Sequence, residues 1–278
     1  LEKGIHVFCE KPITLDPADA KELTELAAAR GLVNQVGYHY RFVGVFQEVK
    51  RLLDAKVIGD VTHVLAEAYG PVVLKPKGGT WRTRREEGGG CLFDYAAHPL
   101  NLVNWYFGKP VAVGGTVLNG IFSENTDDEV YSTLYFDGGL SAQLSVNWSD
   151  ESHRKMSTKL TIMGTNGKIS ADRQEVQVYL REAEGAPAPY KQGWTVRNTT
   201  ELTEEVWFYI RGEEYSAQMD YFVQQVKAKS LDNVNSFASA AVTDEVIGML
   251  IADAETGTRT STVAKRKAAK RKRFPLFG

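Results

Sequence analysis

The first 37 residues follow the order strand, helix, strand, and this order constrains the fold more than any other stretch. Apolar runs at 5–9 and 32–37 flank a segment with the marks of a helix. Asp16 suits the N-cap, Pro17 the first helical position and Gly31 the C′ position. Two strands joined by a helix lie parallel in one sheet, with a right-handed crossover. The sequence therefore predicts a parallel α/β unit at this end.

Polar residues follow both of these strands. Glu10, Lys11 and Pro12 come directly after the first strand, and Tyr38 and Arg41 come after the second. Ligands of open parallel sheets bind at the carboxyl ends of the strands. We therefore expect these side chains to border a binding site.

Beyond a helix predicted at 43–55, the pattern becomes strand-like. A strand is expected at 61–69, and six more are expected at 111–119, 129–136, 140–148, 159–164, 167–171 and 175–180. Asp137-Gly138-Gly139 is a strong hairpin signal, so this part predicts an antiparallel sheet of five or six strands. Residues 183–205 suggest a long loop, and helices are expected at 213–229 and 237–255.

Composition narrows the class of protein. The chain has 278 residues, of which 43% are hydrophobic and 24% charged, which suits a globular protein of two domains. It holds no apolar run of membrane-spanning length, and we expect no membrane partner. The two cysteines, Cys9 and Cys91, show no metal-ligand spacing. We therefore expect no metal site and a reducing, cytoplasmic location.

Charge is distributed unevenly along the chain. Residues 265–273 hold seven basic side chains, and the rest holds 26 basic and 35 acidic ones, a formal charge of about −9. A basic tail can bind nucleic acid or an anionic membrane, or it can lie on the acidic body. The body shows no basic–aromatic pattern, so nucleic acid is not the expected partner.

The segment 88–99 combines three glycines with a carboxylate and a histidine. If a helix starts near Tyr95, Asp94 is its N-cap and His98 lies one turn in, on the same side. The positive end of the helix would disfavour an imidazolium there, which leaves His98 neutral as a general base requires. The alternative is a capped helix whose histidine is merely packed.

Three segments together resemble the Gfo/Idh/MocA family, named after glucose–fructose oxidoreductase, inositol dehydrogenase and rhizopine catabolism. They are Val7-Phe8-Cys9-Glu10-Lys11-Pro12, then Val36-Gly37-Tyr38-His39-Tyr40-Arg41-Phe42 with Ile58-Gly59-Asp60-Val61, and Trp81-Arg82 with Gly88-Gly89-Gly90-Cys91-Leu92-Phe93-Asp94 and His98. The turn Gly164-Thr165-Asn166-Gly167 also fits. The resemblance runs in order from Ile5 to about residue 260.

The resemblance implies an α/β plus α+β protein: a Rossmann domain followed by a domain with an open, mainly antiparallel sheet. It assigns 1–40 to the last part of the nucleotide-binding domain, 41–264 to a substrate and oligomerisation domain, and 265–278 to a basic tail. The glycine-rich phosphate loop is not in this sequence, and on the order of 90 residues would precede it. The chain alone should then bind NAD or NADP poorly and be inactive, and the choice between the two cofactors cannot be read.

The same resemblance implies Lys11, Asp94 and His98 as the catalytic set. It implies hydride transfer between nicotinamide and a secondary alcohol or ketone of a sugar, polyol or sugar derivative, with His98 as the base. The expected cofactor-binding residues are Glu10, Lys11, Pro12 and Arg41. The expected substrate-binding residues are Tyr38, Trp81, Arg82, Asp94 and His98. Four arginines suggest a sugar with an anionic group: Arg41, Arg82, Arg84 and Arg85.

Two departures and two alternatives remain open. Ala96 stands where the family usually has glycine, and Asn101 where an aspartate often follows the histidine. A redox-neutral glycosidase of the same family, which re-reduces its sugar on a retained NAD, is one alternative. A non-catalytic oligomeric binding protein is the other. In each case a homodimer or homotetramer is expected to form through the antiparallel sheet.

Overall fold

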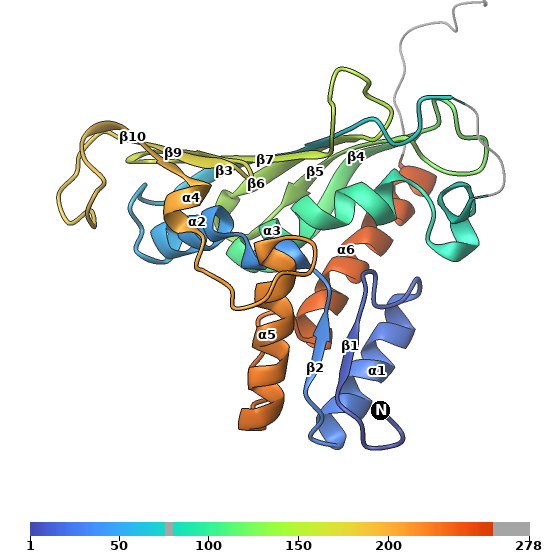
Figure 1. Ribbon diagram of the computed structural model, residues 1–278. Helices are drawn as coiled ribbons and strands as arrows, with labels where there is room; N and C mark the ends of the chain where they lie inside the picture. The colour runs from blue at the N-terminus through green and yellow to red at the C-terminus, as the bar shows by residue number, and fades with distance from the viewer. Residues whose placement is uncertain (76–79, 258–278) are drawn as a thin grey trace, which may run out of the picture.

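The computed structural model describes residues 1–75 and 80–257, and it contains two separate sheets. The basic tail at 265–278 lies outside the described residues. Figure 1 shows the small N-terminal sheet projecting beneath one side of a broad sheet. Within the described part of the chain, no helix is both long enough and apolar enough to cross a membrane.

The small sheet confirms the predicted parallel unit. Strands β1 (Val7–Cys9) and β2 (Asn34–Val36) pair in parallel, and α1 (Pro17–Ala29) connects them. The Asp16 carboxylate accepts a 2.8 Å hydrogen bond from the amide of Ala18, which caps the helix. Gly31 follows the last turn with a φ of +60°, a conformation that favours glycine.

The large sheet has eight strands in the order β10-β9-β8-β7-β3-β6-β5-β4. Its pairs are antiparallel except β3 with β6, which run parallel, so the expectation of an open, mainly antiparallel sheet is confirmed. The strands are β3 (Val61–Tyr69), β4 (Ala112–Asn119), β5 (Glu129–Tyr135), β6 (Ser141–Asn147), β7 (Ser157–Gly164), β8 (Gly167–Ala171), β9 (Glu175–Leu180) and β10 (Gly193–Asn198).

Strand β10 corrects the prediction of a long loop at 183–205. It pairs with β9 alone, from Gly193 opposite Leu180 to Asn198 opposite Glu175. No residue of this edge strand is fully buried. Its alternation is therefore weak in the sequence, and the polar, proline-containing stretch before it obscures the signal. The sheet consequently has more strands than the five or six expected.

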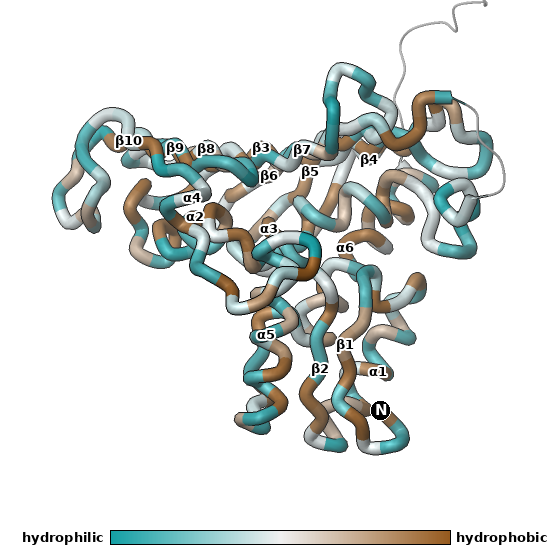
Figure 2. Tube along the Cα trace, in the orientation of Figure 1, coloured by the Kyte–Doolittle hydropathy of each residue, from teal (hydrophilic) through white to brown (hydrophobic). Residues whose placement is uncertain are grey.

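One face of the large sheet holds the core. Helices α2 (Gly44–Asp54), α3 (Ala97–Phe107) and α6 (Phe237–Thr256) cover this face, as Figure 1 shows. Alternate strand residues such as Val64, Ala66 and Ala68 are fully buried against them. Figure 2 shows brown, apolar stretches of tube on this side, interleaved with teal ones along the strands. The described residues place no helix on the opposite face.

The last two predicted helices are present, but the first is less buried than its sequence indicates. Helix α5 (Glu213–Ala228) runs beside β2, where Gln35 donates a 2.9 Å hydrogen bond to the carbonyl of Gln218. Its fully buried residues are polar, and Val223 of the apolar stripe is 42% exposed. Phe222 packs edge-on against Phe8 of β1.

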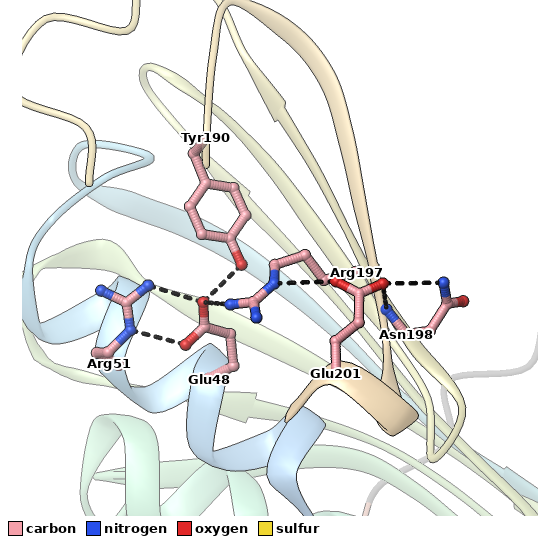
Figure 3. Close-up of polar contacts among 6 residues, drawn as sticks. All are labelled: Glu48, Arg51, Tyr190, Arg197, Asn198 and Glu201. Atoms are coloured by element: carbon pink, nitrogen blue, oxygen red, sulfur yellow. Dashed lines mark hydrogen bonds and ion pairs between the residues drawn. The ribbon is translucent and has the colours of Figure 1, made fainter. Parts of the chain in front are cut away.

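A polar network centred on Glu48 fastens the edge of the sheet to α2 (Figure 3). The buried Glu48 carboxylate accepts two 2.7 Å hydrogen bonds from Arg51, one of 2.6 Å from the Tyr190 hydroxyl and one of 3.3 Å from Arg197. Arg197 also bonds Glu201 in the short helix α4 (Thr199–Leu202). This network joins α2, β10 and α4.

Candidate functional site

The candidate site lies where the carboxyl end of β1 meets the start of the helix that leads into α3. Gly90 has a φ of +110°, and a Cβ at Gly89 would lie 2.5 Å from the carbonyl oxygens of Trp81 and Arg82. Only glycine fits this close approach without displacement of the backbone. The glycines thus bring the 81–89 turns against the start of the helix.

The structure corrects the prediction that Asp94 caps this helix. Helical backbone begins at Cys91 with a π-helical stretch, Leu92–Ala96, so Asp94 lies inside it. Asp127 supplies the cap instead: its carboxylate accepts a 2.6 Å hydrogen bond from the amide of Leu92, and its carbonyl accepts one of 2.8 Å from Cys91. Because this cap comes from a distant segment, the Asp94 carboxylate is free for other partners.

Those partners are the two cations of the predicted site. Lys11 Nζ lies 3.0 Å from Asp94 Oδ1 and donates a 2.8 Å hydrogen bond to the Asp94 carbonyl. Arg82 Nε lies 3.1 Å from Asp94 Oδ2, and its guanidinium stacks over the Trp81 ring at 4.5 Å. The Lys11 and Asp94 side chains are only 12% and 14% exposed. Lys11, Asp94 and Arg82 therefore form one half-buried charged group.

His98 lies on α3 within a shell of aromatic rings. Its ring centre is 4.9 Å from that of Tyr40, 5.2 Å from that of His39 and 6.3 Å from that of Tyr38. The residue is 7% exposed, and its Nδ1 is buried without a hydrogen-bond partner. The ring's remaining exposure leaves Nε2 as the nitrogen that a ligand can reach.

The neutral state expected for His98 is confirmed, but its cause differs from the prediction. Burial in the aromatic shell lowers the pKa of His98 well below its ordinary value, and the positive charges of Lys11 and Arg173 lower it further. Burial likewise lowers the pKa of His39 to about 3. Desolvation and nearby cations, and not the end of the helix, therefore hold these imidazoles neutral.

The remaining predicted site residues lie in different surroundings. Glu10 is exposed at the end of β1, and its carboxylate lies over Gly37. Pro12 follows Lys11 through a cis peptide bond. Tyr38 is only 1% exposed, and Trp81 is 40% exposed.

Arg41 is not brought together with Lys11. It is 3% exposed and donates hydrogen bonds to Asn101 Oδ1 at 2.7 Å, the Asn101 carbonyl at 3.1 Å, the Ser239 hydroxyl at 2.7 Å and the carbonyl of Val234. Its guanidinium thus joins α3 to the start of α6. Asn101, the departure from the family pattern, is the residue that holds it.

The other arginines expected to attract an anionic substrate are also occupied. Arg84 forms an ion pair with Glu87, and Arg85 lies 3.7 Å from the Asp127 carboxylate. With Arg82 held by Asp94, each of these guanidinium groups has a carboxylate partner within the protein.

Sequence reasoning missed two residues that reach the aromatic shell. Tyr215, at the start of α5, stacks on His39 with ring centres 4.5 Å apart. Arg173, in the turn between β8 and β9, lies 5.6 Å from the Tyr40 ring centre and forms an ion pair with Glu214. Both are far from the glycine motif in sequence, and no local spacing indicates that they meet it.

Two hollows of the surface differ in their relation to this cluster. One of about 690 Å³ lies between α4 and the start of α5 and is lined by Trp207 and Tyr209, but by no member of the Lys11 group. Another of about 450 Å³ is lined by Thr158 and Arg173, which both contact Tyr40. The second hollow is the one adjacent to His98.

Comparison with protein families gives two matches. Residues 1–38 match the model of the oxidoreductase family with an NAD-binding Rossmann fold, and residues 46–170 match the GFO/IDH/MocA C-terminal domain. The two matches belong to the same family and follow one another in the order in which its domains occur.

Curated relatives have related names. The chain is 31% identical to dTDP-3,4-didehydro-2,6-dideoxy-alpha-D-glucose 3-reductase of Streptomyces violaceoruber, over 62% of this chain and 49% of that protein. It is 30% identical to trans-1,2-dihydrobenzene-1,2-diol dehydrogenase of Xenopus laevis, over 52% and 43%. It is 23% identical to D-glucoside 3-dehydrogenase of Escherichia coli, over 93% and 73%. The chain thus spans about half the length of the first two.

Solved structures share the fold. Levoglucosan dehydrogenase in complex with NADH and L-sorbose has a TM-score of 0.80 at 20% identity, over 91% of this chain and 72% of that one. Aldose-aldose oxidoreductase from Caulobacter crescentus has a TM-score of 0.73 at 21% identity, over 92% and 72%. At this level of identity, the likeness establishes a common fold.

Proposed function

The chain belongs to the GFO/IDH/MocA oxidoreductase family, and on that premise we propose that it catalyses hydride transfer between a nicotinamide cofactor and a secondary alcohol or ketone of a sugar, polyol or sugar derivative. The observation that carries this proposal is the hydrogen-bonded pair of Lys11 and Asp94 beside the neutral His98. Oxidation of an alcohol needs an acceptor for the hydroxyl proton and a donor for the oxygen. These two groups supply both functions.

Each residue then has a distinct role. His98 accepts the hydroxyl proton through Nε2, since its depressed pKa keeps the ring unprotonated. Lys11 donates a hydrogen bond to the substrate oxygen and stabilises its developing negative charge. Asp94 fixes the Lys11 ammonium through its side chain and its carbonyl, and Arg82 holds the other oxygen of that carboxylate. Asp94 and Arg82 therefore act as positioning residues.

The cofactor fits at the carboxyl ends of β1 and β2. A side chain at Gly37 would lie 3.0 Å from the Glu10 carboxylate, so the absence of a Cβ leaves Glu10 packed over this strand end. Glu10, Lys11 and Pro12 would border the nicotinamide end of NAD or NADP. The cofactor, when bound, accepts or delivers the hydride. Arg41 is omitted from this set because its donors serve Asn101, Val234 and Ser239.

The same premise carries the domain and assembly proposals. We assign 1–40 to the nucleotide-binding part and 41–264 to the substrate and oligomerisation part. The uncovered face of the large sheet is proposed as the contact between copies of the chain. Tyr179, Trp194 and Val196 support this assignment, because they lie on neighbouring strands and are 38%, 50% and 48% exposed.

The test is NAD(P)H formation by the full-length gene product with a panel of polyols and sugars. Lys11→Met and His98→Gln should each lower kcat by about 10²- to 10⁴-fold while circular dichroism stays unchanged. Asp94 keeps Arg82 as a partner in the first variant, so the fold should survive.

His153→Gln is the control, because this half-exposed histidine stacks on Tyr69 away from the site. Near-normal turnover of a folded Lys11 or His98 variant would refute the mechanism. Product formed without net NADH would identify redox-neutral chemistry instead of dehydrogenation.

A further inference from the structure

The hollow of about 450 Å³ beside the candidate site is lined by more positive than negative side chains. The start of β7 contributes Lys155 and Thr158, and the turn between β8 and β9 contributes Asp172 and Arg173. In the described part of the chain, Lys155 forms no ion pair and no side-chain hydrogen bond. This hollow therefore holds an uncommitted ammonium group.

The hollow and His98 share one tyrosine ring. Thr158 donates a 3.3 Å hydrogen bond to the Tyr40 hydroxyl, and the Arg173 guanidinium lies 5.6 Å from the centre of the same ring. The His98 ring centre is 4.9 Å from the Tyr40 ring centre. A sugar whose reacting hydroxyl lies at His98 can therefore extend a substituent past Tyr40 to Arg173.

The carboxylates around the hollow do not consume its cations. Glu214 takes only Nη2 of Arg173, and the remaining N–H groups of this guanidinium have no hydrogen-bond partner among residues 1–75 and 80–257. Asp172 accepts hydrogen bonds of 2.7 and 3.2 Å from the amides of Gln174 and Glu175, so its charge is directed into its own turn. A planar guanidinium with free donors suits a carboxylate or a phosphate.

We infer that this hollow is a subsite for an anionic group of the substrate, a carboxylate or a phosphate, which Arg173 and Lys155 bind while the reacting carbon lies at Lys11 and His98. The inference rests on the proposed function for the location of the reacting carbon. It replaces the arginines that the sequence suggested for this role, since those are paired within the protein.

Binding can be measured separately from catalysis. Isothermal titration calorimetry on the full-length gene product would compare D-glucuronate, D-glucose 6-phosphate and D-glucose at low ionic strength. At least one anion should bind tenfold or more tightly than glucose, and the affinity should fall as salt is added. Which of the two anions binds distinguishes a sugar acid from a sugar phosphate.

Two variants and a control locate the site. Lys155→Gln should weaken binding of the anion severalfold, and the double variant R173Q/E214Q should weaken it tenfold or more without leaving Glu214 unpaired. Arg154→Gln removes a neighbouring exposed cation that does not line the hollow, and its affinity should match wild type.

Equal binding of glucose and both anions, or no binding of either anion, would overturn the subsite. Full anion affinity in both pocket variants, or an equal loss in the Arg154 control, would also overturn it. Hydride transfer from a neutral polyol in any of these cases would leave the proposed function standing. Tight anion binding without hydride transfer to or from any sugar would support the subsite and contradict the function.

Discussion

Asp244 provides a pH test of the packing between α6 and the segment that follows β1. Its side chain is 3% exposed, and neither carboxylate oxygen has a hydrogen-bond partner of normal geometry. The amides of Ile13 and Thr14 face it and partly favour the charged form, but burial dominates and raises the pKa of Asp244 from 3.8 to about 7. The native protein therefore holds this proton at a pH where the unfolded chain has released it.

The sign and size of the effect follow from proton linkage. Below pH 4 the carboxyl group is protonated in both states, so burial of the charge costs nothing. As pH rises from 4 to 7, the unfolded state loses the proton first, and the free energy of unfolding falls. A difference of roughly three pKa units corresponds to about 4 kcal/mol, fully lost above pH 7.

Asp244→Asn removes this titration. The variant should therefore gain up to about 4 kcal/mol over wild type between pH 4 and pH 8, whatever constant effect the amide has. Urea denaturation followed by tryptophan fluorescence at pH 4.5, 6 and 8 gives the difference at each pH. Glu255→Gln changes the same charge at an exposed position of the same helix and should show a flat difference. A flat difference for Asp244→Asn would refute the reasoning.

Two further substitutions test the scaffold. Glu48→Gln weakens the bonds to Arg51, Tyr190 and Arg197 and should cost about 2 kcal/mol of unfolding free energy, measured in urea; an unchanged midpoint would contradict a stabilising network. Gly89→Ala places a methyl group 2.5 Å from three backbone carbonyl oxygens and should lower stability by about 1–3 kcal/mol. Gly114→Ala, whose added carbon meets only ordinary contacts at 3.4 Å, is its control, and equal melting temperatures of the two variants would contradict the predicted clash.

Short-range signals in the sequence predicted much of the fold. Asp16, Pro17 and Gly31 mark the ends of α1, and the structure begins and ends that helix at the expected residues. The hairpin at Asp137–Gly139 joins β5 to β6, and Thr165 and Asn166 turn β7 into β8. In these cases a residue and its neighbours determine the local backbone, so no tertiary information is needed.

Contacts between distant segments could not be predicted in the same way. Asp94 has the residue type and position of an N-cap, but the cap comes from Asp127, 33 positions beyond it. Similarly, Arg173 and Tyr215 reach the aromatic shell from a turn and a helix that no motif connects to His98. The sheet and α5 bring these segments together, and only the assembled fold reveals the contacts.

The cause of the neutral His98 has a consequence for the proposed reaction. An imidazole kept neutral by a helix end would have a basicity independent of the substrate. Here, burial comes first, and the charges of Lys11, His39 and Arg173 follow it. An anion bound at Arg173 would offset one of these positive charges and raise the pKa of His98 toward its ordinary value. Occupation of the anionic subsite would thus make His98 a stronger base, and a neutral sugar of the same shape would lack this effect. The proposed subsite would therefore select substrates through proton transfer as well as through affinity.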